Sequence, residues 1–204
     1  MLPMKTVGQS LFTAIDFESA GATQGSTDHP VQVGLASWSP DTGITNTFVS
    51  YIHTNQPILW SARKVHGIGQ DHLKDAPPLL TLWPELRSRL HGSIVVAHGK
   101  GTEKRFLRAF PGHGFGPWLD TLLLARAIWP DLPDHSLSAL CSSLELTEKT
   151  KSLVPAKSWH DALFDAVASL LILESAVLHL QLLDTPVAHL LQPDTSPWHR
   201  SRNS

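Results

Sequence analysis

The order of apolar segments along the chain predicts an α/β protein with a sheet between two layers of helices. Three strand-like segments come first, strand-like and helical segments then alternate, and the last part of the chain is helical. One of the later segments is short and almost purely apolar, which is typical of a strand buried on both faces. Together these features predict three layers around a mixed sheet of five strands.

The composition fits one domain of ordinary size. The chain has 204 residues, of which 42% are hydrophobic and 17% are charged, as in a protein with a packed core. Its formal net charge of −2 excludes a polybasic protein that binds nucleic acid through bulk charge alone. The single cysteine, Cys141, excludes an internal disulfide and suits a reducing compartment. Since no signal pattern and no apolar run of about 18 residues is visible, we expect a cytoplasmic protein with no membrane partner.

The first third of the chain has the pattern of a β-meander. Three strands are expected: an apolar run at 11–18 that ends in two acids, a partly alternating segment at 31–38, and a segment at 44–52 rich in β-branched and aromatic residues. Residues 40–43 (PDTG) have the chemistry of a turn, so we expect the second and third strands to form a hairpin.

The middle of the chain changes to a helical period. We expect helices at 61–66 and at 79–90, where leucines recur four residues apart. The apolar segment 93–98 is the expected buried strand, and a helix over 102–110 is expected to begin with Thr102 as its N-cap.

The last part combines a short strand with three helices. Residues 118–119 are expected to form a brief strand that leads into a helix at 120–129, with further helices at 136–144 and 160–183.

We expect a single domain over residues 10–192. It is preceded by an N-terminal extension, residues 1–9, and followed by a flexible C-terminal tail, residues 193–204, rich in Pro, Ser, Arg and Asn.

Two acids lie near the end of the first expected strand. Asp16 and Glu18 are two residues apart, so the period of a strand places both carboxylates on one side. Buried together they would repel each other unless a cation lay between them. The alternative is that both simply face water at a strand end.

Other acids have equally simple alternatives. Asp165 lies among apolar residues near the start of the long helix, five residues after His160, and either faces the protein or lies on the solvent side. Glu103 in the first turn of its helix is favoured by the helix dipole alone. Asp120 fits an N-cap.

Five short segments carry a resemblance to a known family. They are 14–18 (AIDFE), 65–68 (VHGI), 95–98 (VVAH), 120–126 (DTLLLAR) and 160–165 (HDALFD). In this order they resemble the histidine-containing (DEDDh) branch of the DEDD 3′–5′ exonuclease superfamily. The stretch 119–141 is similar to the proofreading subunit of bacterial replicative polymerases.

The resemblance implies a ribonuclease H-like fold and hydrolysis of phosphodiester bonds with two divalent cations, Mg²⁺ or Mn²⁺. It implies that Asp16, Glu18 and Asp165 bind metal and that His160 is the general base. Two cations about 3.5–4 Å apart can clamp a scissile phosphate, and Mg²⁺ prefers oxygen ligands. A histidine with an ordinary pKa near 6.5 can accept a proton from water at neutral pH.

One position departs from the family pattern. Where the family has an aspartate that binds the second cation, this chain has Glu103, and Gly99 replaces an asparagine. We expect Glu103 to act as a repositioned metal ligand. The alternative is a non-catalytic or weakly active nucleic-acid-binding relative in which the second metal site is impaired.

Four residues are candidates for substrate binding. Phe17 offers a ring or a backbone amide to the terminal nucleotide, or belongs to the core. His98 recurs in the family pattern, although hydrogen bonding within the protein is its simpler role. Lys104 and Arg105, with their basic neighbours, contact phosphates or form a solvated face.

The expected partner is therefore the 3′ end of single-stranded DNA or RNA. No motif distinguishes the two nucleic acids, and no motif indicates a protein partner. The other histidines form no close-spaced ligand pattern, so a zinc hydrolase is poorly supported.

Overall fold

A computed structural model describes residues 5–22 and 27–193 of the chain. Its centre is a five-stranded sheet in the order β3-β2-β1-β4-β5. The strands are β1 (Phe12–Ser19), β2 (Pro30–Ser39), β3 (Gly43–Tyr51), β4 (Ile94–Ala97) and β5 (Trp118–Asp120). The first three are antiparallel neighbours, and β4 and β5 run parallel to β1. The predicted mixed sheet and its β2–β3 hairpin are confirmed.

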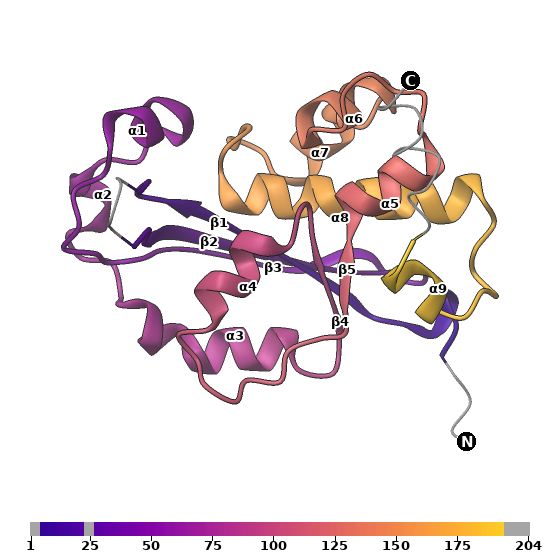
Figure 1. The fold of residues 1–204 in the computed structure, drawn as a ribbon, viewed down its shortest axis with the longest axis horizontal. Helices are drawn as coiled ribbons and strands as arrows, with labels where there is room; N and C mark the ends of the chain where they lie inside the picture. Colours follow the sequence, from indigo (N-terminus) through magenta and orange to yellow (C-terminus); the bar gives the residue numbers. More distant parts are fainter. Residues whose placement is uncertain (1–4, 23–26, 194–204) are drawn as a thin grey trace.

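Helices cover both faces of this sheet (Figure 1). The α-helices are α1 (Trp60–His66), α2 (Gln70–Leu73), α3 (Trp83–Leu90), α4 (Gly101–Leu107), α5 (Thr121–Ile128), α6 (Leu137–Ser143), α7 (Thr147–Leu153), α8 (Ala162–His179) and α9 (Ala188–Leu191). Two short 3-10 helices, η1 (Val7–Gln9) and η2 (Leu79–Leu82), complete the described part.

The alternation of β1 separates two cores. Phe12 and Ala14 point to the face covered by α8, where they pack with residues such as Phe164 and Val167. Ile15 lies on the opposite face and packs with residues of α3 and α4. Figure 1 shows α8 with α5 to α7 on one side of the sheet and α3 and α4 on the other. This is the three-layer ribonuclease H-like arrangement that the sequence predicts.

The helix predicted at 79–90 is divided, which corrects that prediction. The chain forms η2 first, and α3 then begins at Trp83 with Pro84 in its first turn. A proline has no N–H to continue a preceding helix but fits the first turn of a new one.

The predicted N-cap at Thr102 is also wrong. The N-cap of α4 is Lys100, and Thr102 lies inside the helix. The backbone N–H groups of Gly99 and Lys100 donate to the carboxylate of Asp120 at 3.0 and 3.2 Å. The cap is thus supplied by the end of β5, a contact that local sequence does not reveal. The helix ends at Leu107, earlier than the expected residue 110.

The long helix is shorter than predicted at both ends. It spans Ala162–His179, and Asp161 is its N-cap, with a side chain that accepts from Leu163 N. By length and composition alone α8 could cross a bilayer, with a mean hydropathy of 1.7 over 18 residues. However, 72% of it is buried inside the protein, as in the central helix of a packed domain.

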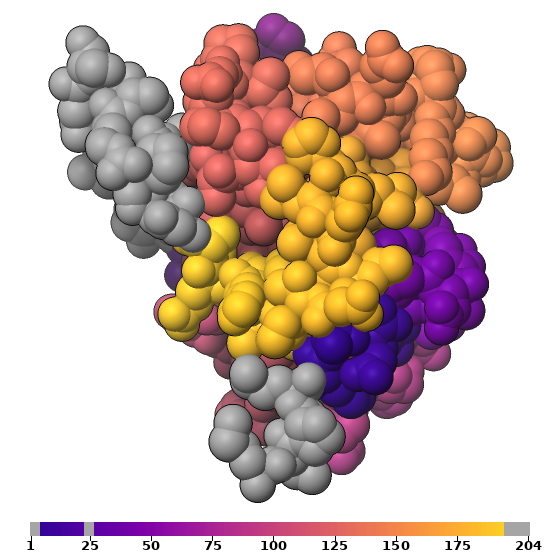
Figure 2. Space-filling model, turned by 90° about the vertical axis from the view of Figure 1, so that its right-hand side faces the viewer, coloured from indigo at the N-terminus to yellow at the C-terminus, as the bar shows by residue number. Residues whose placement is uncertain are grey.

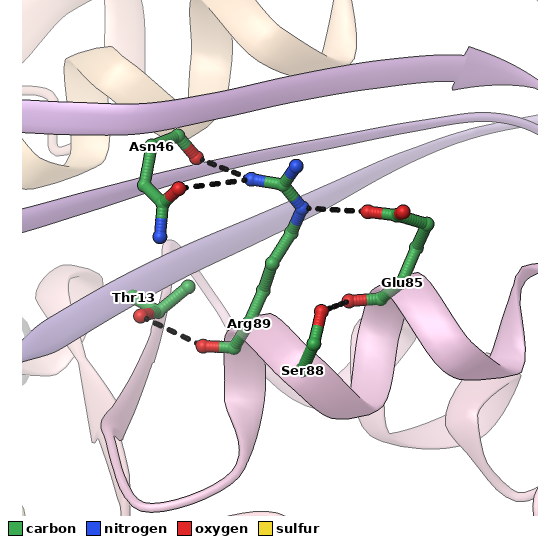
Figure 3. Close-up of polar contacts among 5 residues, drawn as sticks. All are labelled: Thr13, Asn46, Glu85, Ser88 and Arg89. Atoms are coloured by element: carbon green, nitrogen blue, oxygen red, sulfur yellow. Dashed lines mark hydrogen bonds and ion pairs between the residues drawn. The ribbon is translucent and has the colours of Figure 1, made fainter.

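A network of side-chain contacts attaches α3 to the sheet (Figure 3). Arg89 Nη1 donates to the backbone carbonyl of Asn46 on β3 at 2.8 Å, and its Nε pairs with Glu85 at 3.1 Å. Thr13 of β1 donates its hydroxyl to the carbonyl of Arg89 at 3.3 Å. These contacts hold α3 against β3 and β1, the strands on either side of β2.

The described ends of the chain lie together (Figure 2). Val7 N donates to the carbonyl of Thr185 at 3.0 Å, and Gly8 N donates to that of Leu183 at 2.8 Å. Val7 is buried in the α8-side core. The domain limits at residues 10 and 192 stay predictions, and most of the expected flexible tail lies outside the described residues.

Candidate active site

Asp16 and Glu18 lie at the carboxyl end of β1, on the face that α8 covers. Asp16 pairs with Gly34 and Glu18 with Gln32 on β2. Both acids share the side of Phe12 and Ala14, as the period of two requires. Both are only partly exposed, so the alternative in which they simply face water does not describe this site.

Gly34 allows α8 to approach β1 closely. A Cβ atom at this position would overlap with the backbone of Ala162 and Leu163 in the first turn of α8. Since Gly34 is the cross-strand partner of Asp16, the start of the helix lies directly beside that acid. Only glycine permits this packing of helix backbone on strand backbone.

A buried glutamine fixes the same turn. Gln32 is 2% exposed and contacts α8 with both ends of its amide. Its Oε1 accepts from the N–H of Ala162 at 2.9 Å, and its Nε2 donates to Asp161 Oδ2 at 3.1 Å. Lys157 Nζ donates to the same oxygen of Asp161 at 2.7 Å. The amide thus links β2, the N-cap of α8 and the loop that precedes it.

This docking brings the third acid and the histidine to the end of β1. One ligand atom from each of Glu18, His160 and Asp165 lies within 4.8 Å of the others. His160 is exposed and adopts a left-handed backbone with φ of 66° just before the helix. Its N–H donates to Asp165 Oδ2 at 3.3 Å, while Asp165 Oδ1 is buried and has no hydrogen-bond partner among the described residues.

Glu103 lies outside this three-residue group. It is buried at the start of α4, and its Oε2 has no hydrogen-bond partner within the described part of the chain. Its charge still raises the pKa of Asp16, so Asp16 feels both Glu103 and Asp165. Asp16 is therefore the acid that connects the two sides of the site.

Burial raises the pKa of every acid in this cluster, and repulsion by neighbouring carboxylates adds to it. Desolvation is the largest cause in each case: it raises the pKa of Glu18 to about 8 and those of Glu103 and Asp165 to about 7. The pKa of Asp16 is raised well above its ordinary value, first by burial and then by Asp165, Glu103 and Glu18. A bound cation would reverse this preference because it favours the charged carboxylates.

The residues fit a divalent cation. Carboxylate oxygens are the ligands that Mg²⁺ and Mn²⁺ prefer, and the unpartnered buried oxygens of Asp165 and Glu103 have no other described partner to satisfy them. Buried like charges at this density need a positive partner.

Two other histidines of the motifs form hydrogen bonds within the protein. His98 Nε2 donates to the carbonyl of His135 at 2.9 Å, and its Nδ1 contacts Thr121 Oγ1 at 3.1 Å. His66 Nε2 donates to the carbonyl of Ser19 at 3.0 Å, and its Nδ1 accepts from Ile68 N. Desolvation lowers the pKa of both rings, which favours the neutral form.

The other substrate-binding candidates have contacts of their own. The side chain of Phe17 is buried against Phe106, with ring centroids 5.4 Å apart. Its ring therefore belongs to the hydrophobic core, the alternative to stacking on a nucleotide. Arg105 forms an ion pair with Asp28 at 3.1 Å. Lys104 is exposed, with its Nζ 5.9 Å from the ring centroid of Trp118.

Asp120 serves the fold in two places at once. Its Oδ1 accepts from the N–H groups of Leu122 and Leu123 as the N-cap of α5, in addition to its bonds to Gly99 and Lys100. The N-cap interpretation is therefore confirmed, and Asp120 also joins β5 to α4.

Sequence reasoning missed Gln32, Gly34 and Lys157. For Gln32 and Gly34 a signal was available, because a polar residue and a glycine interrupt the otherwise apolar second strand. Both weaken a buried strand unless another element packs closely at that point.

A mixed sheet in this order, with acids gathered at the end of β1, defines a ribonuclease H-like hydrolase. Residues 13–173 match the family model described as exonuclease, and the chain belongs to that family. This confirms the resemblance seen in the five motifs and, at the level of the family, the expectation of an enzyme.

The curated relatives are much longer proteins. A DNA polymerase III subunit epsilon-like protein of Rhodobacter capsulatus is 28% identical over 163 residues, which cover 78% of this chain and 22% of that protein. The PolC-type DNA polymerase III of Bacillus subtilis is 26% identical over 138 residues, covering 64% of this chain and 9% of that one.

Solved structures show the same fold. Exonuclease X in complex with 5′ overhanging duplex DNA has a TM-score of 0.72 at 24% identity, covering 89% of this chain and 99% of that one. The nuclease domain of 3′hExo, a DEDDh family member bound to rAMP, has a TM-score of 0.67 at 15% identity, covering 85% and 94%.

Proposed function

We propose that the protein is a metal-dependent exonuclease that removes nucleotides from the 3′ end of single-stranded DNA or RNA. The observation that carries this proposal is the cluster of Glu18, His160 and Asp165 within 4.8 Å, next to the partly buried Asp16. The names of the relatives and structural neighbours, which include polymerase III subunits and exonucleases, support the same chemistry.

The metal ligands would be Asp16, Glu18 and Asp165, with Glu103 as a further ligand whose charge acts on Asp16. Two divalent cations, Mg²⁺ or Mn²⁺, would supply charge stabilisation at the scissile phosphate and an activated water. The protein provides a rigid set of oxygens, because β1 carries two of them and the docked first turn of α8 carries the third.

His160 is the proposed general base. Its ring is exposed and therefore open to a substrate, while its N–H bond to Asp165 ties its backbone to the metal ligands. As a general base, its ring can accept the proton of the attacking water. The proton leaves through the exposed ring, so solvent can return the base to its neutral form.

A basic surface on α4 is the proposed contact for the phosphate backbone. Lys104 is exposed on the helix, Arg108 is exposed at its C-cap, and Lys100 lies at its N-cap. Arg105 is in part neutralised by Asp28, so we assign it a weaker role than Lys104. His98 and Phe17 remain proposed only as residues near the terminal nucleotide, through the backbone in the case of Phe17.

The test is a matched assay of single-stranded DNA and RNA with Mg²⁺, Mn²⁺ or EDTA. A label at the 5′ end should show products that shorten one nucleotide at a time from the 3′ end. Internal cleavage, or turnover that persists in EDTA, would contradict the proposal.

A second function is favoured by one observation, the separation of Glu103 from the three-residue group. In this alternative the chain binds strands but does not cleave them. If the chain is instead the proposed exonuclease, Glu103→Asp should keep nucleotide release and Glu103→Gln should weaken cation binding at least about ten-fold, since even outer partners of metal ligands contribute that much. Strand binding without turnover in Mn²⁺ would support the alternative.

A further inference from the structure

Helix α1 has a surface that the catalytic cluster does not use. All seven of its residues are described, and none of them is buried. Trp60 is 75% exposed and Val65 is 53% exposed. An exposed tryptophan of this extent contributes almost nothing to the core, and large apolar side chains on a surface mark interaction sites when they are grouped.

Both ends of α1 are fixed to the segment that follows Glu18. The N–H of Leu59, the N-cap of the helix, donates to the carbonyl of Ala20 at 2.8 Å. At the other end, His66 Nε2 donates to the carbonyl of Ser19 at 3.0 Å. Figure 1 shows α1 beyond the carboxyl end of β1, where the acids gather. Helix α1 therefore lies next to the end of the strand that carries Asp16 and Glu18.

The charge of α1 is entirely positive. Its sequence, WSARKVH, contains Arg63 and Lys64 and no acid. Lys64 Nζ lies 5.2 Å from the centroid of the Trp60 ring, so a cation and an aromatic ring are in contact on the surface of this helix. Apolar side chains of a protein partner would gain little from two exposed cations, and a second copy of this helix would bring like charges together. An anionic chain with flat, stackable groups matches both features.

We propose that α1 binds the single-stranded nucleic acid just upstream of the 3′-terminal nucleotide, with a base stacked on Trp60 and phosphates near Arg63 and Lys64. This inference rests on the proposed function, because it assigns the strand that the catalytic cluster would shorten. Stacking on an aromatic side chain beside cations is the general way in which proteins hold single strands without reading their sequence.

The first test is binding of fluorescent oligothymidylate in EDTA, which prevents turnover. Trp60→Ala should weaken binding about ten-fold, since each stacked base contributes on that scale, whereas Trp60→Phe should keep most of the affinity. Leu178→Ala is the matched control, because Leu178 is similarly exposed, at 64%, near the end of α8. Unchanged affinity in Trp60→Ala would overturn the proposal.

The second test separates the strand surface from the catalytic cluster. The p-nitrophenyl ester of thymidine 5′-monophosphate needs only the metal site, so its hydrolysis in Mn²⁺ should be the same in Trp60→Ala and the wild type. Equal losses with the ester and the oligonucleotide would mean that Trp60 supports the fold, and a changed oligomeric state would mean that α1 binds protein. Either result overturns the proposal. If the wild type hydrolyses neither substrate, the proposed function fails, while the binding assay still decides whether α1 holds a strand.

The contribution of Arg63 and Lys64 to strand binding can be measured from the salt dependence of the affinity. For single strands the logarithm of affinity falls with the logarithm of salt concentration by about 0.7 per phosphate contact. The double variant Arg63→Gln, Lys64→Gln should therefore reduce the salt slope by more than about 0.7, and an unchanged slope would contradict a role for these two residues.

Discussion

At the scale of single residues, the site contains carboxylates that repel one another when no cation is bound. Glu18, Glu103 and Asp165 all have a pKa raised to about 7 or 8, mainly by burial. A protein retains such a cluster against its cost in stability when a ligand neutralises it. The same electrostatics makes each acid testable by stability as well as by activity.

Asp165→Asn should abolish metal-dependent nucleotide release and at the same time raise the melting temperature of the metal-free protein. The amide keeps the shape of the side chain but removes one of the repelling charges. Thermal unfolding with EDTA and with Mn²⁺ measures both effects, because the variant should also lose most of the stabilisation by metal. Full nucleotide release by a folded variant would show that Asp165 is not a metal ligand.

At the scale of elements, the critical contact is the docking of the first turn of α8 on β2. Gly34 removes the side chain that would prevent it, and Gln32 replaces hydrogen bonds that the helix start would otherwise lack. This contact places residues separated by more than a hundred positions in one site.

Gly34→Ala should therefore move the start of α8 and lower stability by about 1–3 kcal/mol, as overpacking of a core does. Nucleotide release should fall further than the loss of folded protein explains, because Asp165 shifts with the helix. Gly101→Ala is a suitable control: it lies in the first turn of α4, and its new Cβ would meet no described atom within 4 Å. Urea unfolding and activity at saturating metal would measure the two effects. Wild-type activity in Gly34→Ala would mean that the close approach is not needed.

Lys157→Met should lower kcat with little change in the affinity for Mn²⁺. Lys157 pairs with the N-cap Asp161 and so holds the loop that carries His160, whereas the acids are held by β1 and α8. A small displacement of a catalytic group can cost up to about a hundred-fold in rate. Lys151→Met removes an exposed ion pair with Glu148 and is the control. A parallel loss of Mn²⁺ affinity would show that the contact supports the metal ligands instead.

At the scale of the whole molecule, charge and pH decide when the protein is stable and when it can act. The formal net charge of −2 includes the four acids of the site, so binding of cations there leaves a positive molecule, with Arg63 and Lys64 on α1 and Lys104 and Arg105 on α4 among its basic residues. A weakly positive protein suits repeated binding and release of a strand end.

The metal-free protein should lose stability as the pH rises from about 5 to about 8. The folded-state pKa of Glu18 is about 8 and that of Asp165 about 7, above the values near 4 of an unfolded chain, so the folded protein binds more protons in this range. The free energy of unfolding therefore falls as these protons leave. Mn²⁺ should restore stability most at the upper end, because it needs the charged carboxylates. Melting temperatures with EDTA and with Mn²⁺ check this, and a melting temperature in EDTA that rises over this range would contradict it.

Much of the fold was predictable because its signals are local. The apolar segment of β1, the turn at 40–43 and the apolar segment of β4 each lie within a few residues, and all three predictions are confirmed. The short helices α2, α7 and α9 were not predicted, since each spans only four to seven residues and has little apolar pattern of its own. Their positions depend on packing against other elements.

The sequence by itself determined the fold class, the family motifs and the shared side of Asp16 and Glu18, because periodicity and motif spacing are properties of neighbouring residues. Only the tertiary structure decided that Asp165 and His160 meet Glu18, that Glu103 lies apart from that group, and that Asp120 caps two elements. These outcomes depend on how closely α8 and α4 approach the sheet. Approach distances are set by contacts such as that of Gly34 with Ala162, which join parts of the chain far apart in sequence.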